Sequence, residues 1–342
     1  MDLLIQQLND PDWQVRMHAA DELTKHPDAK AVPALIDALG DEQYNVWTSA
    51  ANALKAIGAP AVDALMAEMD DPDPRCRRMA AQVLGGIPGA PAQRGLHKAL
   101  DDPDTIVRVN AISGIAGARN LDREDLQNRV SLLINVIIED PNELVWSNAA
   151  DALAKIKDHA AQQTLIYAPG PGSQGARWRL AQALGKTQNA DAVMPLLRAL
   201  HDVDTQVRRA AASALGELGS FGGGSDRFAV TGLLNGLRDP DAKVRANVAL
   251  ALGKMHDDGA VEPLIGALSD PDSETRASAA QALGMLRDDR AVESLIAAMK
   301  DPNIYVRINA ANAVTAASPP TPASLPAPST AAFPTKKFSS KP

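Results

Sequence analysis

The sequence is poor in aromatic residues and cysteine, and it lacks long apolar runs. Aromatic side chains make up 3% of the 342 residues, so the 45% of hydrophobic residues are mostly small aliphatic ones. Such side chains favour close contacts between helices. The single cysteine, Cys76, excludes an intrachain disulfide, which favours a reducing compartment. No stretch has the roughly 18 apolar residues of a membrane span, and no signal peptide is recognisable. We therefore expect a cytoplasmic protein without a membrane partner.

Positive charge is also in short supply. Lysine and arginine total 34 residues against 42 aspartate and glutamate residues, which gives a net charge of −8. A negative field repels phosphate backbones, so we expect no nucleic-acid partner.

The usual catalytic and metal-binding motifs are missing as well. The sequence has no glycine-rich dinucleotide motif, no P-loop and no cysteine pair for zinc. We therefore expect no cofactor, no metal and no catalytic residues, and the sequence favours a protein that is not an enzyme.

What fills the chain instead is one repeated pattern. Ten copies align on the residue that is Val244 in the stretch DPDAKVRANVALALG, at spacings of 30 or 31 residues with two longer ones of 37 and 38. The aligned column reads Val15, Val46, Cys76, Val107, Val145, Ala176, Val207, Val244, Thr275 and Val306.

Each copy has the signals of two helices. Aspartate stands five positions before the column in nine copies, and proline follows it in seven. We interpret this aspartate as an N-cap and the proline as the first helical residue. Apolar residues then follow with helical spacing, and stretches such as AVEPLIGAL from Ala260 predict a second, shorter helix. Neither helix can bury its apolar stripe alone, so the units must stack.

The sequence therefore predicts an all-α fold, a right-handed α-solenoid of about ten helix–turn–helix repeats over residues 1–317. Residues 318–342 hold seven prolines with serine, threonine and alanine. This composition is typical of a disordered tail, which serves either as a solubilising extension or as a recognition segment.

The phased pattern DPDxxVRxxAAxALG…AVxxLIxAL resembles HEAT repeats of the short bacterial type called PBS lyase HEAT-like, over about residues 1–317. The resemblance brings three functional types with it. The deoxyhypusine hydroxylase type binds two irons through His-Glu dipeptides, and none of the six histidines here precedes a glutamate. The DNA-glycosylase type needs a basic concave face, which the acidic balance disfavours. The phycobilin lyase type shares the repeat pattern itself.

From these observations we predict a non-enzymatic scaffold or adaptor that binds another protein, since solenoids present long surfaces rather than catalytic sites. The alternative is a phycobilin lyase or chaperone that acts on a phycobiliprotein.

A column of arginines is the first candidate feature. Arginine follows the aligned column by one position in eight copies, on the packing side of the helix. We predict that it pairs with an aspartate of an adjacent repeat and forms a structural ladder. The ladder residues are Asp10, Arg16, Asp102, Arg108, Asp239, Arg245, Asp270, Arg276, Asp301 and Arg307.

The irregular centre of the chain is the second candidate. Trp146 replaces the ladder arginine, either as a packing residue or as one that stacks on a ligand. The next column is predicted to point away from the core, which would expose Trp178. The resemblance also implies that second helices line the concave side, where Val136 and Ile166 would form an apolar centre near Tyr167. We predict partner binding at Val136, Trp146, Ile166, Tyr167 and Trp178, unless these are core residues whose helical phase is misjudged.

Overall fold

The computed structural model describes residues 1–117, 123–156, 174–219 and 227–317. These residues form nineteen α-helices, five short 3-10 turns and no strands. The predicted all-α solenoid is therefore confirmed. The predicted tail, residues 318–342, lies outside the described residues.

The first helices of the repeats carry the aligned column. They are α2 (Trp13–Lys25), α4 (Tyr44–Ile57), α6 (Pro74–Leu84), α8 (Thr105–Gly117), α10 (Glu143–Lys155), α12 (Gln174–Lys186), α14 (Thr205–Gly219), α16 (Ala242–Met255), α18 (Ser273–Leu286) and α20 (Ile304–Ala317).

The second helices are mostly shorter. They are α1 (Asp2–Gln7), α3 (Val32–Leu39), α5 (Val62–Glu68), α7 (Ala90–Ala99), α9 (Arg123–Glu139), α13 (Val193–Ala199), α15 (Arg227–Gly236), α17 (Val261–Ala267) and α19 (Val292–Ala298). A 3-10 turn precedes α3, α5, α13, α17 and α19.

The N-cap of the first helix is not the aspartate that the sequence suggested. In the repeat of α16 the cap is Asp241, whose carboxylate accepts the backbone N–H of Val244 at 3.0 Å. The preceding Asp239 instead accepts the N–H of Asp241 at 2.8 Å, which fixes the turn before the helix. The prediction was wrong by two residues because two aspartates flank the proline in DPD, and either one can cap a helix. The first aspartate is thereby free to bind another group.

Small residues let successive first helices approach closely. The Cβ of Ala279, Ala280 and Ala282 in α18 is fully buried. Gly253 of α16 lies so near α18 that a Cβ added to it would stand 2.6 Å from the Cα of Ala282. Successive second helices make far fewer contacts with one another.

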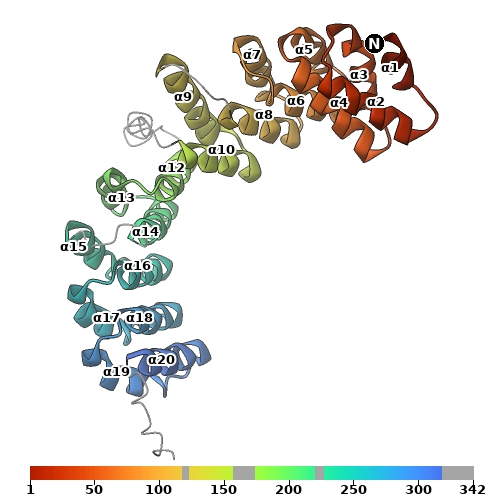
Figure 1. Cartoon of the computed structure of the whole chain (residues 1–342). Helices are drawn as coiled ribbons and strands as arrows, with labels where there is room; N and C mark the ends of the chain where they lie inside the picture. Colours follow the sequence, from red (N-terminus) through yellow and green to blue (C-terminus); the bar gives the residue numbers. More distant parts are fainter. Residues whose placement is uncertain (118–122, 157–173, 220–226, 318–342) are drawn as a thin grey trace, which may run out of the picture.

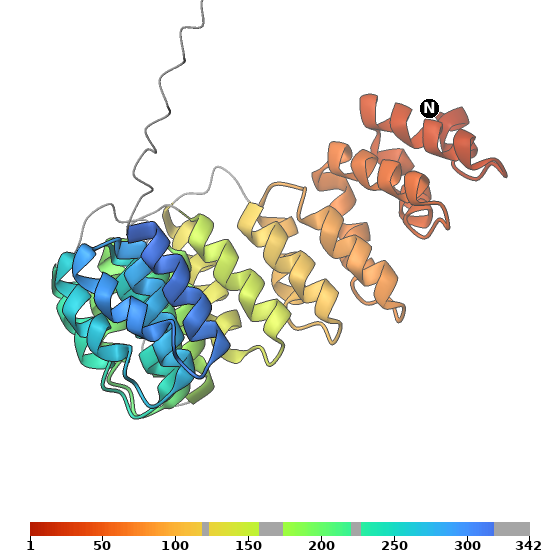
Figure 2. The same cartoon turned by 90° about the horizontal axis from the view of Figure 1, so that it is seen from below.

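This difference determines which way the solenoid curves. Figure 1 shows a bent arc with the first helices on its inner edge and the second helices, such as α9, α15 and α19, on its outer edge. Figure 2 shows the red and orange N-terminal helices extending away from the stacked green and blue helices of the C-terminal half. The expectation that second helices line the concave side was wrong, because the side with the closer helix spacing becomes the inner one.

The close approach at Gly253 predicts opposite effects for two glycine substitutions. Gly253→Ala should lower the free energy of unfolding by about 1–3 kcal/mol, since its Cβ would overlap the backbone of Ala282. Gly266→Ala should raise it by up to about 1 kcal/mol, because Gly266 is helical, exposed and has open space beside it. Urea unfolding followed by circular dichroism measures both changes. Equal effects of the two variants would contradict the packing described here.

Candidate functional site: the interaction surfaces of the solenoid

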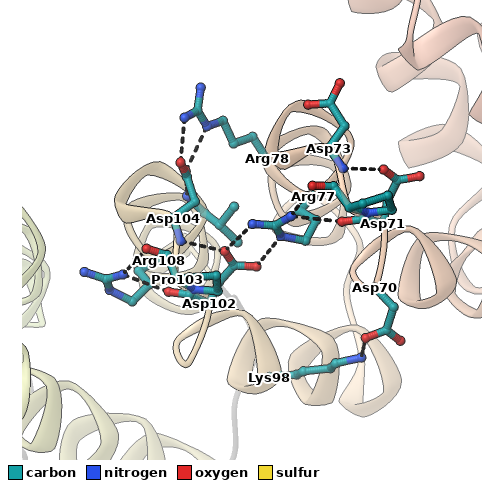
Figure 3. A network of polar contacts seen from close by, with 12 residues as sticks. Asp70, Asp71, Asp73, Arg77, Arg78, Lys98, Asp102, Pro103, Asp104 and Arg108 are labelled. Atoms are coloured by element: carbon teal, nitrogen blue, oxygen red, sulfur yellow. Dashed lines mark hydrogen bonds and ion pairs between the residues drawn. The ribbon is translucent and has the colours of Figure 1, made fainter.

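An arginine joins each repeat to the next along most of the chain. In α16 the Nε and Nη2 atoms of Arg245 donate to the two carboxylate oxygens of Asp270, each at 2.8 Å. Its Nη1 atom donates to the backbone oxygens of Asp239 and Pro240 at 2.8 and 3.3 Å. One guanidinium therefore holds the turn of its own repeat and the first aspartate of the following repeat. Figure 3 shows this arrangement for Arg77 and Asp102.

Seven such pairs occur among the described residues, with Nε–Oδ2 distances of 2.6–2.9 Å. They are Arg16–Asp41, Arg77–Asp102, Arg108–Asp140, Arg177–Asp202, Arg208–Asp239, Arg245–Asp270 and Arg276–Asp301. We call them the aspartate–arginine ladder. At its ends, Asp10 accepts through its backbone oxygen from Arg16, and Arg307 donates to the backbone oxygens of Asp301 and Pro302.

Two further arginines form a second kind of link, one residue later in the repeat. Arg78 pairs with Asp104, and Arg209 pairs with Asp241, both with 2.6 Å between Nη2 and Oδ2. In each case the carboxylate is the N-cap of the following first helix. These hydrogen bonds lower the pKa of Asp104 and of Asp241 to about 2, although partial burial opposes the shift. Sequence reasoning missed this link because it placed the column toward solvent.

The ladder is interrupted between α10 and α12 by an aromatic cluster. Trp146 takes the place of the arginine and meets Trp178 edge-on, with ring centroids 5.0 Å apart. Arg179 lies over both rings, at 5.4 and 5.8 Å from their centroids. Its Nη1 atom also donates to the backbone oxygen of Asp140 at 2.6 Å. The cluster therefore connects the end of α9 to α12 without a ladder pair.

Several residues of the predicted central binding surface are buried or half-buried in the structure. Trp146 is only 3% exposed, so the expectation that it contacts a partner does not agree with the structure. Trp178 and Val136 are half-buried and pack against the core rather than projecting from it. The expected exposure of Trp178 was wrong because a first helix packs against three neighbours: its own second helix and the first helices on both sides. Ile166 and Tyr167 lie outside the described residues.

The free side of the first helices forms a different surface, which we call the inner strip. It consists of the residues six positions after the aligned column, on the side of the helix away from the core columns. The inner strip comprises Asp21, Asn52, Gln82, Ser113, Asp151, Gln182, Ser213, Leu250, Gln281 and Asn312. Most of these residues are exposed, nine are polar, and none is lysine or arginine. This column is visible in the sequence, but the sequence analysis expected the second helices on the concave side and therefore placed the binding surface there.

One group among the described residues brings three potential metal ligands together. The side chains of Glu68, Asp71 and Cys76 have ligand atoms within 4.8 Å of one another, and all three residues are partly exposed. Two carboxylates and one thiol do not complete the four-ligand shell of a structural zinc site. No described helix is both long and apolar enough to cross a bilayer.

The stacked helix pairs define the chain as an α-solenoid, and comparison with known proteins identifies its family. A model of HEAT repeats matches residues 1–92, 93–168, 172–226 and 230–320. The chain therefore belongs to the HEAT-repeat family. No curated protein matches it.

Solved structures of karyopherins share the fold. Kap121p bound to Pho4p superposes with a TM-score of 0.69 at 12% identity, covering 93% of this chain and 41% of that one. Kap95p, from a structure with RanGDP, gives a TM-score of 0.57 at 14% identity, covering 92% and 51%. The chain thus spans about half of these relatives or less, and at such low identity the likeness concerns the fold alone.

The link between Arg209 and Asp241 predicts a pH-dependent contribution to stability. An aspartate has a pKa of about 3.9 in an unfolded chain, so a folded pKa of about 2 stabilises the fold above pH 4. This contribution is lost as the pH falls from about 4 to about 2. Arg209→Gln should therefore lower the free energy of unfolding at pH 7 by about 1 kcal/mol, after solvent screening.

Thermal unfolding between pH 2 and 7 measures the effect, and the difference from the unsubstituted protein should vanish near pH 2. The control is Arg198→Gln, which removes the same charge from an exposed residue of α13. A difference for Arg209→Gln that did not change with pH would contradict the assignment.

The aromatic cluster predicts a structural role for Trp178. Trp178→Ala should lower the free energy of unfolding by about 2 kcal/mol, since it removes half-buried apolar area and the edge-on contact with Trp146. Tyr305→Ala is the control, because Tyr305 is 69% exposed and its loss should cost less than about 0.5 kcal/mol. Urea unfolding monitored by circular dichroism compares the two. A similarly small decrease in the free energy of unfolding for both variants would show that Trp178 contributes no more to stability than an exposed residue.

Proposed function

We propose that this protein is a non-enzymatic scaffold or adaptor that binds a protein segment along the inner face of its solenoid. The observation that carries the proposal is the inner strip, which follows the first helices along the inner edge of the arc (Figure 1). A partner on this face would contact many repeats at once.

The chemistry of the inner strip suits a polypeptide backbone. Amide side chains such as those of Asn52, Gln82 and Gln281 can both donate and accept hydrogen bonds. They match the alternating N–H and C=O groups of an extended segment, whereas they offer no cation to a phosphate. Kap121p, which shares the fold, is described in complexes with the proteins Nup53p and Pho4p. These features support a partner that is another protein rather than nucleic acid or a membrane. We also propose that the protein is cytoplasmic.

The function predicts different effects for substitutions on the two sides of the solenoid. Ser113→Arg together with Ser213→Arg would place two long cations on the inner strip, in α8 and α14. The matched control is Ser131→Arg with Ala297→Arg, which adds the same charge to exposed positions of the second helices α9 and α19. The amount of partner protein that co-purifies with the inner variant should fall at least about tenfold, whereas the control should retain the same amount as the unsubstituted protein.

The measurement is purification of the tagged protein from its own host, with quantitative mass spectrometry of the proteins that co-purify. Retention of all partners by the inner variant would rule out the inner strip as the binding surface. The visible spectrum of the same samples tests the PBS lyase HEAT-like alternative, since a bilin band with a phycobiliprotein would favour the lyase or chaperone function.

A further inference from the structure

The ladder has a second interruption, between α4 and α6, and it leaves one carboxylate behind. Trp47 occupies the helix position from which seven other first helices send an arginine to the next repeat. It packs instead against Tyr44 of its own helix, with ring centroids 4.9 Å apart. Asp71, the first aspartate of the following repeat, still accepts the N–H of Asp73 at 2.7 Å. Its carboxylate receives no guanidinium from α4.

The interruption at Trp146 differs in this respect. There the aspartate of the following repeat is replaced as well, since the sequence has Pro171 at that position. Trp178 and Arg179 fill the space between the helices. Both halves of the ladder pair are thus lost together at Trp146, whereas only the arginine is lost at Trp47.

The junction between α4 and α6 is also open. These two helices contact each other much less than other neighbouring first helices do. Cys76 of α6 shows the consequence, because it is partly exposed whereas Val46 and Val107, its equivalents in the adjacent repeats, are fully buried. The side chain of Cys76 is therefore reachable from solvent at this junction.

Negative charge is concentrated at this opening. The carboxylates of Glu68 and Asp71 and the thiol of Cys76 lie within 4.8 Å of one another. Partial burial raises the pKa of Glu68, and the neighbouring charges of Asp71 and Asp37 raise it further. Burial likewise raises the pKa of Cys76. Arg77 of the same repeat donates to the backbone oxygen of Asp71 at 2.9 Å, but its guanidinium pairs with the carboxylate of Asp102, so among the described residues no guanidinium pairs with the Asp71 carboxylate.

We propose that Asp71, together with Glu68, binds the guanidinium of an arginine from a partner protein, which completes the ladder from outside the chain. The seven equivalent aspartates each hold a guanidinium, so the position is already built for this ligand. Arginine suits it better than lysine because its planar fork meets both oxygens of a carboxylate. This inference rests on the proposed binding of a protein partner and specifies one contact of that partner.

Cys76 provides a direct way to test the site in the full-length protein. It is the only cysteine of the chain, so a peptide bearing a disulfide can be captured there and nowhere else. The probes are the peptide Gly-Arg-Gly-Cys, with its thiol as a mixed disulfide, and the same peptide with citrulline in place of arginine. Citrulline has the shape of arginine without its charge. Mass spectrometry measures the fraction of protein that carries the peptide at equilibrium in 2-mercaptoethanol. This fraction reports how tightly the arginine or citrulline side chain of the peptide binds beside Cys76.

We expect the arginine peptide to be captured about tenfold more favourably than the citrulline peptide. Asp71→Asn should abolish this preference, and it preserves the turn because the amide oxygen still accepts the N–H of Asp73. Trp47→Arg should abolish it as well, by supplying the guanidinium from α4. Asp101→Asn, which removes the same charge from an exposed residue outside the cluster, should leave it intact.

Equal capture of the two peptides by the unsubstituted protein would overturn the proposal, as would a preference that survives Asp71→Asn or Trp47→Arg. Either result would leave the proposal that the inner strip binds a partner unaffected, because the loss of partners through Ser113→Arg and Ser213→Arg is measured separately. Conversely, failure of those inner variants to lose partners would not alter the arginine preference at Asp71.

Discussion

Successive first helices approach so closely that backbone meets backbone, and the rest of the solenoid follows from this contact. A methyl group at Gly185 would stand 2.7 Å from the Cβ of Ala214, and one at Gly284 would stand 3.0 Å from the Cα of Ala313. Successive second helices contact one another much less. Unequal spacing on the two sides bends the stack, and the bend decides which surface faces inward. The inner strip therefore faces inward because alanine and glycine residues, such as Gly253 and Ala282, let the first helices approach closely.

Close packing brings the helices together, and the aspartate–arginine ladder determines how each repeat is turned on the next. Each guanidinium donates both to the backbone of its own turn and to the first aspartate of the following repeat, so it couples the two repeats. These side chains are largely shielded, with Arg245 at 12% exposure, so both members of a pair matter. A carboxylate left alone in such a place costs more than an absent pair, because its desolvation is not compensated. The two interruptions of the ladder differ in this respect.

Periodicity predicted the helices and the core well, since the apolar residues five and eight positions after the aligned column, such as Ala249 and Leu252, are buried in every repeat but the last, where Ala311 and Val314 are partly exposed. The pairing of Arg245 with Asp270 also agrees with the spacing of the two columns. The failures concern relations between repeats. The spacing of one helix cannot show that Trp178 meets a neighbouring helix, or that its column faces the next repeat. Nor can it show which of Asp239 and Asp241 caps α16, because both have the right chemistry and only the turn geometry decides.

A regular array makes its own irregularities informative, because each position has equivalents in the same chain. Val46 and Val107 show what Cys76 would look like in a closed junction, and Asp102 shows how Asp71 would be held if an arginine preceded it. The comparison needs no homologous sequence, since the neighbouring repeats are the reference. It separates a junction that has been refilled, at Trp146, from one that has kept an acceptor, at Trp47. A binding surface spread along the inner strip provides contact area. A single carboxylate without a guanidinium partner instead fixes the register of the partner, since it accepts one side chain at one place. In a solenoid whose repeats are otherwise alike, such a position can fix where along the arc a partner begins.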